Sequence, residues 1–74
     1  MVMKKATKKD IAFGKRLAKL RKKTGLSQEL LGEKSGLSTT FIGLLETAKR
    51  RASLKSLQKI ASVLKVKVKY LINF

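Results

Sequence analysis

Apolar side chains recur every three or four residues along most of this 74-residue chain, which is the spacing of one helix face. Four such runs each follow a serine or threonine, whose hydroxyls accept hydrogen bonds from the first backbone N–H groups of a helix. These expected N-caps are Thr7, Ser27, Ser38 and Ser53. The pattern therefore predicts an all-α chain with helices over residues 8–24, 28–35, 39–47 and 54–64.

Acidic and glycine residues mark the ends of these helices. Asp10 stands three residues after Thr7, which is the arrangement of a capping box. Gly25 and Gly36 are placed to end the first and second helices, because glycine adopts a left-handed backbone without steric cost. Gly32 interrupts the second helix at a cost of about 1 kcal/mol relative to alanine. We expect another helix to cross closely there.

The expected core is formed by the apolar residues on the inner face of each helix. These residues are Phe13, Leu17, Leu20, Leu30, Leu31, Ile42, Leu45, Leu54, Leu57, Ile60, Ala61 and Leu64. A chain of this length is near the lower limit for one domain without disulfides or metals, so dimerisation is expected to add stability.

The last ten residues carry two conflicting signals. Val66, Val68 and Tyr70 alternate with lysines, which slightly favours an edge strand that pairs across a dimer. A short helix over residues 68–72 would instead bury three apolar side chains, namely Val68, Leu71 and Ile72.

Composition restricts the chemistry of the chain. It has 19 Lys and Arg residues, four acidic residues, and neither His nor Cys, for a net charge of +15. This excludes most catalytic and metal-binding constellations, so we expect no enzyme, no metal, no cofactor and no small-molecule ligand. No apolar run approaches the ~18 residues of a membrane span, and we expect a cytoplasmic, nucleoid-associated protein. The charge favours a polyanionic partner, whether DNA, RNA or an anionic membrane.

One segment departs from this basic character. SGLSTTFIGLLETA, residues 35–48, contains no Lys or Arg and includes the predicted third helix. The second and third helices are joined by SGLS, a spacing typical of a helix-turn-helix. On spacing alone, two adjacent helices of any small bundle explain it about equally well.

The residues themselves add a resemblance. LAKLRKKTGLSQELLGEKSGLSTTFIGLLE followed by SLKSLQKIASVL resembles the Cro/phage-repressor (XRE) helix-turn-helix family over residues 13–72, and its restriction–modification controller proteins most of all. The resemblance implies a five-helix, lambda-repressor-like domain whose last helix covers residues 68–72. Ala48 and Ala52 stand where the family usually has Gly and Pro, so the loop after the third helix could change path or that helix could lengthen. Lys67 replaces the usual Ser or Thr cap.

The resemblance also implies that the partner is double-stranded DNA, and it assigns roles in binding it. The third helix becomes the recognition helix in the major groove, and its expected base-reading residues are Ser38, Thr39, Thr40, Gly43 and Leu44. Leu44 is expected to face solvent. Short polar and apolar side chains read base edges while cations bind phosphates, which explains a helix without Lys or Arg. Because this helix has no Gln, Asn or Arg, DNA shape should contribute much of the specificity.

Other positions acquire supporting roles from the same resemblance. The expected phosphate-binding residues are Gln28, Lys49, Arg50, Arg51 and Ser53, and Gln28 also braces the recognition helix. Arg21 and Glu46 are expected to form a structural ion pair. The apolar tail is expected to form a homodimer interface through Tyr70, Ile72 and Phe74.

The predicted function is a sequence-specific, dimeric transcriptional regulator that reads a pseudo-palindromic operator. Residues 1–9 are interpreted as a basic N-terminal arm and residues 10–74 as the helix-turn-helix domain. Two alternatives stay open: an antitoxin or other protein-interaction module, and a non-specific basic binder of nucleic acids or membranes.

Overall fold

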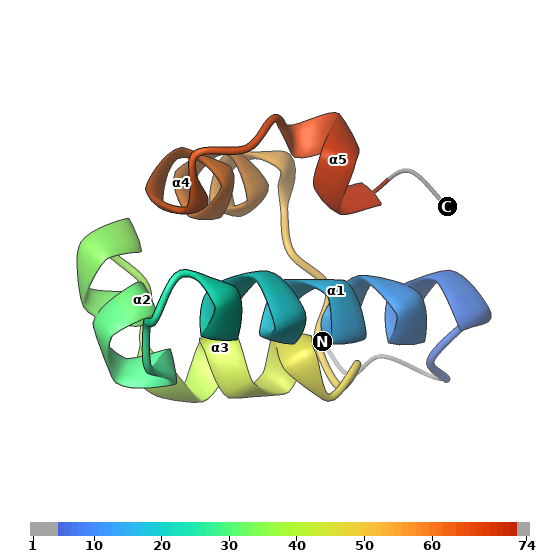
Figure 1. The fold of residues 1–74 in the computed structure, drawn as a ribbon. Helices are drawn as coiled ribbons and strands as arrows, with labels where there is room; N and C mark the ends of the chain where they lie inside the picture. The colour runs from blue at the N-terminus through green and yellow to red at the C-terminus, as the bar shows by residue number, and fades with distance from the viewer. Residues whose placement is uncertain (1–4, 73–74) are drawn as a thin grey trace.

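The computed structural model describes residues 5–72, which form five α-helices and no strand (Figure 1). The helices are α1 (Lys8–Lys23), α2 (Gln28–Ser35), α3 (Thr39–Glu46), α4 (Leu54–Leu64) and α5 (Val68–Ile72). The predicted all-α, five-helix class is therefore confirmed. Helices α1 and α3 end one residue earlier than predicted.

All four expected N-caps are present. Thr7 Oγ1 accepts a hydrogen bond from the Asp10 backbone N–H at 3.1 Å, and the Asp10 carboxylate accepts one from the Thr7 N–H at 2.9 Å. These reciprocal bonds complete the predicted capping box. Ser27, Ser38 and Ser53 each accept from the backbone N–H three residues later. The helix starts are therefore fixed by local sequence.

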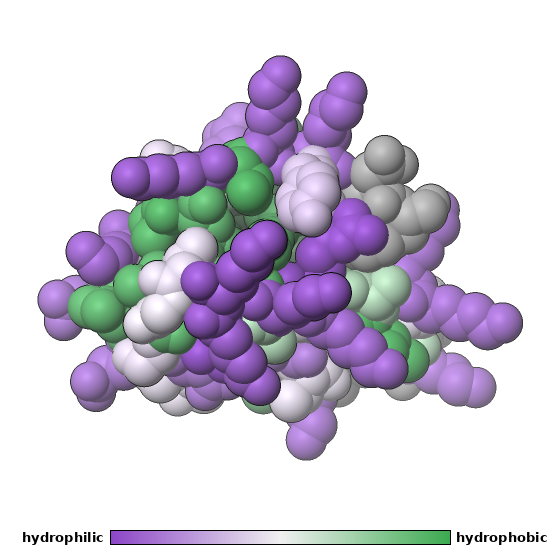
Figure 2. All heavy atoms as spheres, in the orientation of Figure 1, coloured by the Kyte–Doolittle hydropathy of each residue, from purple (hydrophilic) through white to green (hydrophobic). Residues whose placement is uncertain are grey.

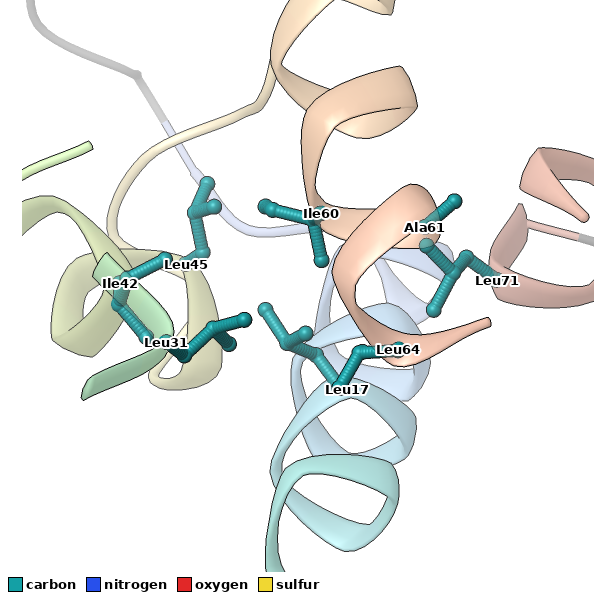
Figure 3. Packing of buried hydrophobic residues seen from close by; sticks show 8 residues of the cluster. All are labelled: Leu17, Leu31, Ile42, Leu45, Ile60, Ala61, Leu64 and Leu71. Carbon is teal, nitrogen blue, oxygen red and sulfur yellow. The ribbon is translucent and has the colours of Figure 1, made fainter. Parts of the chain in front are cut away.

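The helices pack around one apolar core to which all five contribute (Figure 3). Helix α1 contacts α3 and α5, while α2 contacts α3 and α4. In Figure 1, α1 and α3 run along one side of the molecule and α4 and α5 lie on the other. The core residues are Leu17, Leu31, Ile42, Leu45, Ile60, Ala61, Leu64 and Leu71.

Two residues expected in this core are exposed. Leu30 is 37% exposed, because adjacent residues of a helix point about 100° apart and its neighbour Leu31 occupies the core. Leu54 is 63% exposed as the first residue of α4. Phe13 and Leu20 are half-buried against the core, as their spacing predicted.

The C-terminal segment is a helix over residues 68–72, as the resemblance implied, and the strand favoured by its alternating pattern is wrong. Leu71 is fully buried where α5 contacts α1 and α4, and Val68 packs half-buried beside the core. Burial of Leu71 in a shared core outweighs the local alternation. Ile72, also expected to be buried, is 48% exposed.

Close backbone approach explains two helical glycines. A Cβ on Gly32 would lie 2.7 Å from the Leu37 carbonyl oxygen, so the nearby element is the following turn and not the crossing helix that was expected. A Cβ on Gly14 would lie 2.5 Å from the Glu46 carbonyl oxygen. Gly14, which the sequence pattern did not single out, is therefore what lets α1 approach the end of α3.

The chain after α3 turns sharply and does not extend that helix. Thr47 forms the C-cap, and Ala48 follows with φ +60° while its side chain is buried. Alanine thus adopts the left-handed backbone that glycine favours, at the position where the resembled family usually has glycine.

Candidate nucleic-acid interface

Helices α2 and α3 form a tight helix-turn-helix. Gly36 ends α2 with φ +72°, and the Leu37 N–H returns a 2.8 Å hydrogen bond to the Gly32 carbonyl. Ser38 then caps α3 through its 3.0 Å bond from the Phe41 N–H. The turn consequently places the start of α3 at the surface while Ile42 and Leu45 enter the core.

The five expected base-reading residues lie on the first two turns of α3 and differ in exposure. Ser38, Thr39 and Thr40 are exposed. Gly43 is half-buried, with the Gln28 side chain 3.6 Å from where its Cβ would be. Leu44 is half-buried instead of facing solvent fully, and it lies outside the buried cluster.

Arg21 and Glu46 form a buried ion pair that joins α1 to the end of α3. Arg21 Nε lies 2.6 Å from Glu46 Oε2, and Nη2 lies 3.1 Å from Oε1. The two side chains are only 10% and 6% exposed. The bonds to Glu46 raise the pKa of the Arg21 guanidinium further, so Arg21 stays charged. Such a bidentate pair fixes both distance and orientation.

Gln28 extends this pair to the start of α2. Its Nε2 donates to Glu46 Oε1 at 3.0 Å, while Arg21 Nη1 donates to the Leu26 carbonyl at 2.9 Å. Three helices are therefore held together by one carboxylate. The Gln28 side chain is half-buried, with its amide nitrogen directed to Glu46 of α3.

The expected phosphate-binding residues of the loop after α3 are exposed. Lys49, Arg50 and Arg51 follow one another there. The Arg50 guanidinium lies 5.6 Å from the centroid of the Phe41 ring, a cation–π contact. Ser53, also exposed, caps α4 and donates its hydroxyl to Ser56 Oγ at 3.2 Å.

Arg51 has an acidic partner that the sequence did not reveal. Its Nη2 lies 3.2 Å from Asp10 Oδ2, and its Nε lies 3.2 Å from Oδ1. The two residues stand 41 positions apart, and no local pattern links a helix cap with a distant loop. The tertiary fold alone brings them together.

The expected dimer contacts lie on α5 and beyond it. Tyr70 is 52% exposed and Ile72 48% exposed, whereas Phe74 lies outside the described residues. The Arg16 guanidinium lies 5.3 Å from the Tyr70 ring centroid and donates to the Tyr70 carbonyl at 2.6 Å. Tyr70 is thus oriented at the surface by α1.

Hydrophilic side chains dominate the visible surface. Figure 2 shows hydrophilic side chains projecting around most of one face, with smaller apolar patches between them. Within residues 5–72, no three His, Cys, Asp or Glu residues gather where a metal ion could bind. No helix in this described part is long and apolar enough to cross a membrane.

Comparisons with known proteins agree with this geometry. The protein family described as "Helix-turn-helix" matches residues 17–71. Control protein C.MunI from Mycoplasma sp is 45% identical over 53 residues, covering 70% of this chain and 72% of that protein.

Two solved structures are also similar to the chain. The restriction-modification controller protein C.AhdI from Aeromonas hydrophila is 39% identical with a TM-score of 0.80, and 82% of this chain aligns with 92% of that one. SinR, the Bacillus subtilis master regulator for biofilm formation, is 31% identical with a TM-score of 0.78 in its complex with DNA, with coverages of 82% and 98%.

The chain belongs to the helix-turn-helix family of the XRE type. It is a DNA-binding regulator of the repressor and controller type, a non-enzymatic class.

Proposed function

We propose that the protein is a sequence-specific, dimeric transcriptional regulator that reads a pseudo-palindromic operator with α3 in the major groove. One observation carries this proposal. The exposed start of α3 presents polar side chains without positive charge, and three exposed cations lie in the loop after the helix. Phosphate binding and base reading are thereby separated in space, as specific recognition requires.

Base reading is assigned to the first two turns of α3. Thr39 and Thr40 offer hydroxyl and methyl groups that suit base edges and thymine methyls. Ser38 keeps its hydroxyl proton for donation while its oxygen caps the helix. Gly43 admits close approach, and Leu44 supplies apolar contact through its exposed part.

Affinity comes mainly from phosphate contacts around that helix. Lys49, Arg50 and Arg51 flank its end, and Gln28 and Ser53 begin α2 and α4, where helix N-termini favour anions. The basic arm, residues 1–9, adds charge, although Lys8 and Lys9 already belong to α1. Each neutralised phosphate releases counterions, so affinity should fall steeply with salt.

Dimerisation is assigned to the exposed apolar side chains of α5, Tyr70 and Ile72, together with Phe74. A two-fold dimer would place two recognition helices about 34 Å apart, matching successive major grooves. Similarity to C.MunI and C.AhdI supports a controller of restriction–modification genes as the subclass. Such a regulator acts at cytoplasmic, nucleoid DNA.

The decisive experiment is selection of bound duplexes from a random DNA pool at about 150 mM salt, followed by sequencing. We expect an enriched site with two-fold symmetry. The Thr39→Ala, Thr40→Ala double variant should change the enriched bases. The Lys49→Ala variant should weaken binding to all sequences and leave those bases unchanged.

Other outcomes would identify the alternatives. A pool that shows no enrichment yet binds at low salt would indicate a non-specific basic binder. Failure to bind duplex DNA at any salt would leave a protein-interaction module, such as an antitoxin, as the better reading.

A further inference from the structure

The carboxylate of Asp10 performs two tasks at the start of α1. One is local, because Asp10 accepts the Thr7 N–H and closes the capping box at 2.9 Å. The other is long-range, because the same carboxylate accepts hydrogen bonds from Arg51 Nε and Nη2 at 3.2–3.3 Å. The Asp10 side chain is 17% exposed, whereas the Arg51 side chain is 59% exposed. A well-held anion thus contacts a largely exposed cation.

The shape of the guanidinium determines what this contact leaves free. Arginine has five N–H donors in a planar fork, and Asp10 engages the edge formed by Nε and Nη2. The edge formed by Nη1 and the second Nη2 proton is not engaged by Asp10. A phosphate can bind the edge that carries Nη1 while Asp10 stays bonded to the edge formed by Nε and Nη2.

We propose that Asp10 is a positioning residue for DNA binding: it holds Arg51 with one guanidinium edge fixed and the other presented to a backbone phosphate. This inference rests on the proposed function and deepens it. A free arginine loses rotamer freedom when it binds a phosphate, and a pre-positioned one loses less. Asp10 therefore favours DNA binding although it is itself an anion.

The surroundings of the pair support this role. Asp10 and Arg51 line a hollow of about 240 Å³ whose apolar members include Phe13, Ala52 and Leu57. The Asp10 side chain is only 17% exposed there, so its carboxylate is partly shielded from solvent while Arg51 stays accessible. The N–H of Thr7 and the guanidinium of Arg51 lower the pKa of Asp10, so its carboxylate is ionised at neutral pH.

A double-mutant cycle with Asp10→Asn and Arg51→Ala tests the proposal. Asparagine keeps the shape of Asp10, and its amide oxygen can still accept the Thr7 N–H. Binding is measured to the duplex enriched in the selection and to a random-sequence duplex of the same length. Glu33→Gln, alone and with Arg51→Ala, is the matched control, because it removes one exposed negative charge elsewhere.

The charge change in Asp10→Asn affects DNA binding by itself. Beyond this charge effect, we expect the substitution to weaken DNA binding about threefold to tenfold when Arg51 is present. That charge effect is read from the same substitution in the Arg51→Ala background. The slope of affinity against salt should also fall by the equivalent of about one phosphate contact when Asp10 is changed, and only when Arg51 is present. Glu33→Gln should show no coupling to Arg51.

Equal effects of Asp10→Asn on DNA binding with and without Arg51 would overturn the proposal. Tighter binding of Asp10→Asn only when Arg51 is present would also overturn it, because it would show that Asp10 competes with phosphate. Thermal unfolding of each variant checks that the fold is kept. Wild-type protein that binds neither duplex would refute the proposed function itself. Wild-type binding without coupling would refute only the role of Asp10.

Discussion

Two arginine–carboxylate pairs tie α1 to the end of α3 and to the loop that follows, and they differ chiefly in burial. Arg21 and Glu46 are at most 10% exposed and share their carboxylate with Gln28. Asp10 and Arg51 meet at the surface, where the Arg51 side chain is 59% exposed. The same chemistry therefore operates in two dielectric environments.

The difference separates a structural pair from one available for binding. A buried charge left without its partner costs several kcal/mol, so the Arg21–Glu46 pair fixes the end of α3 against α1. A surface pair contributes only about 0–1 kcal/mol to stability. In the role proposed for it, Arg51 keeps one guanidinium edge on Asp10 and offers the other edge to a phosphate.

Among the substitutions that test this comparison, Glu46→Gln should lower the free energy of unfolding the most. It leaves Arg21 buried without its counter-charge, so we expect the free energy of unfolding to fall by about 3–5 kcal/mol. Urea unfolding followed by circular dichroism measures this. Glu33→Gln, on the exposed side of α2, should change it by less than about 0.5 kcal/mol. A loss below about 1 kcal/mol for Glu46→Gln would show that the buried pair behaves like a surface pair.

Gly14→Ala should have the next largest effect, because the new Cβ would lie 2.5 Å from the Glu46 carbonyl oxygen. Helices α1 and α3 must then separate, and we expect a loss of about 1–3 kcal/mol. Gly43→Ala is the control, since its Cβ would meet the Gln28 side chain at an ordinary 3.6 Å. Gly43→Ala should be neutral or stabilising by up to about 1 kcal/mol. Equal thermal unfolding of the two variants would contradict close packing at Gly14.

Asp10→Asn should have the smallest effect on stability, at most about 1 kcal/mol at neutral pH. The pKa of Asp10 is lowered in the folded protein by Thr7 and Arg51, so its contribution is present above the ordinary value of 3.8. It is lost as the pH falls through the lower folded value. The stability difference between wild type and Asp10→Asn should therefore shrink below pH 3.8. Urea midpoints across this range test it, and a difference independent of pH would be inconsistent with an ionic interaction.

Prediction from sequence succeeded where the determinants are local. Thr7, Ser27, Ser38 and Ser53 cap helices because each hydroxyl reaches a backbone N–H only three residues away. Prediction failed where packing between helices determines whether a side chain is buried. Leu30 and Leu54 have the apolar character of core residues, but the packing of α2 and α4 leaves them exposed.

The candidate interface divides in the same way. The sequence alone shows that residues 35–48 lack Lys and Arg and that a run of cations follows them. The proposal that this surface reads bases rests on that pattern. The contacts that position this part of the chain cannot be predicted from the sequence. Asp10 meets Arg51, and Gly14 meets the Glu46 backbone, through contacts between distant segments.

By itself, the sequence determined the helix starts and the charge pattern, because capping, periodicity and composition act over a few residues. Its resemblance to a known family indicated the helix-turn-helix. Only the tertiary structure decided that the lysine-rich tail is a helix and that Asp10 holds Arg51. Burial of Leu71 and the meeting of residues 41 positions apart both require the assembled core.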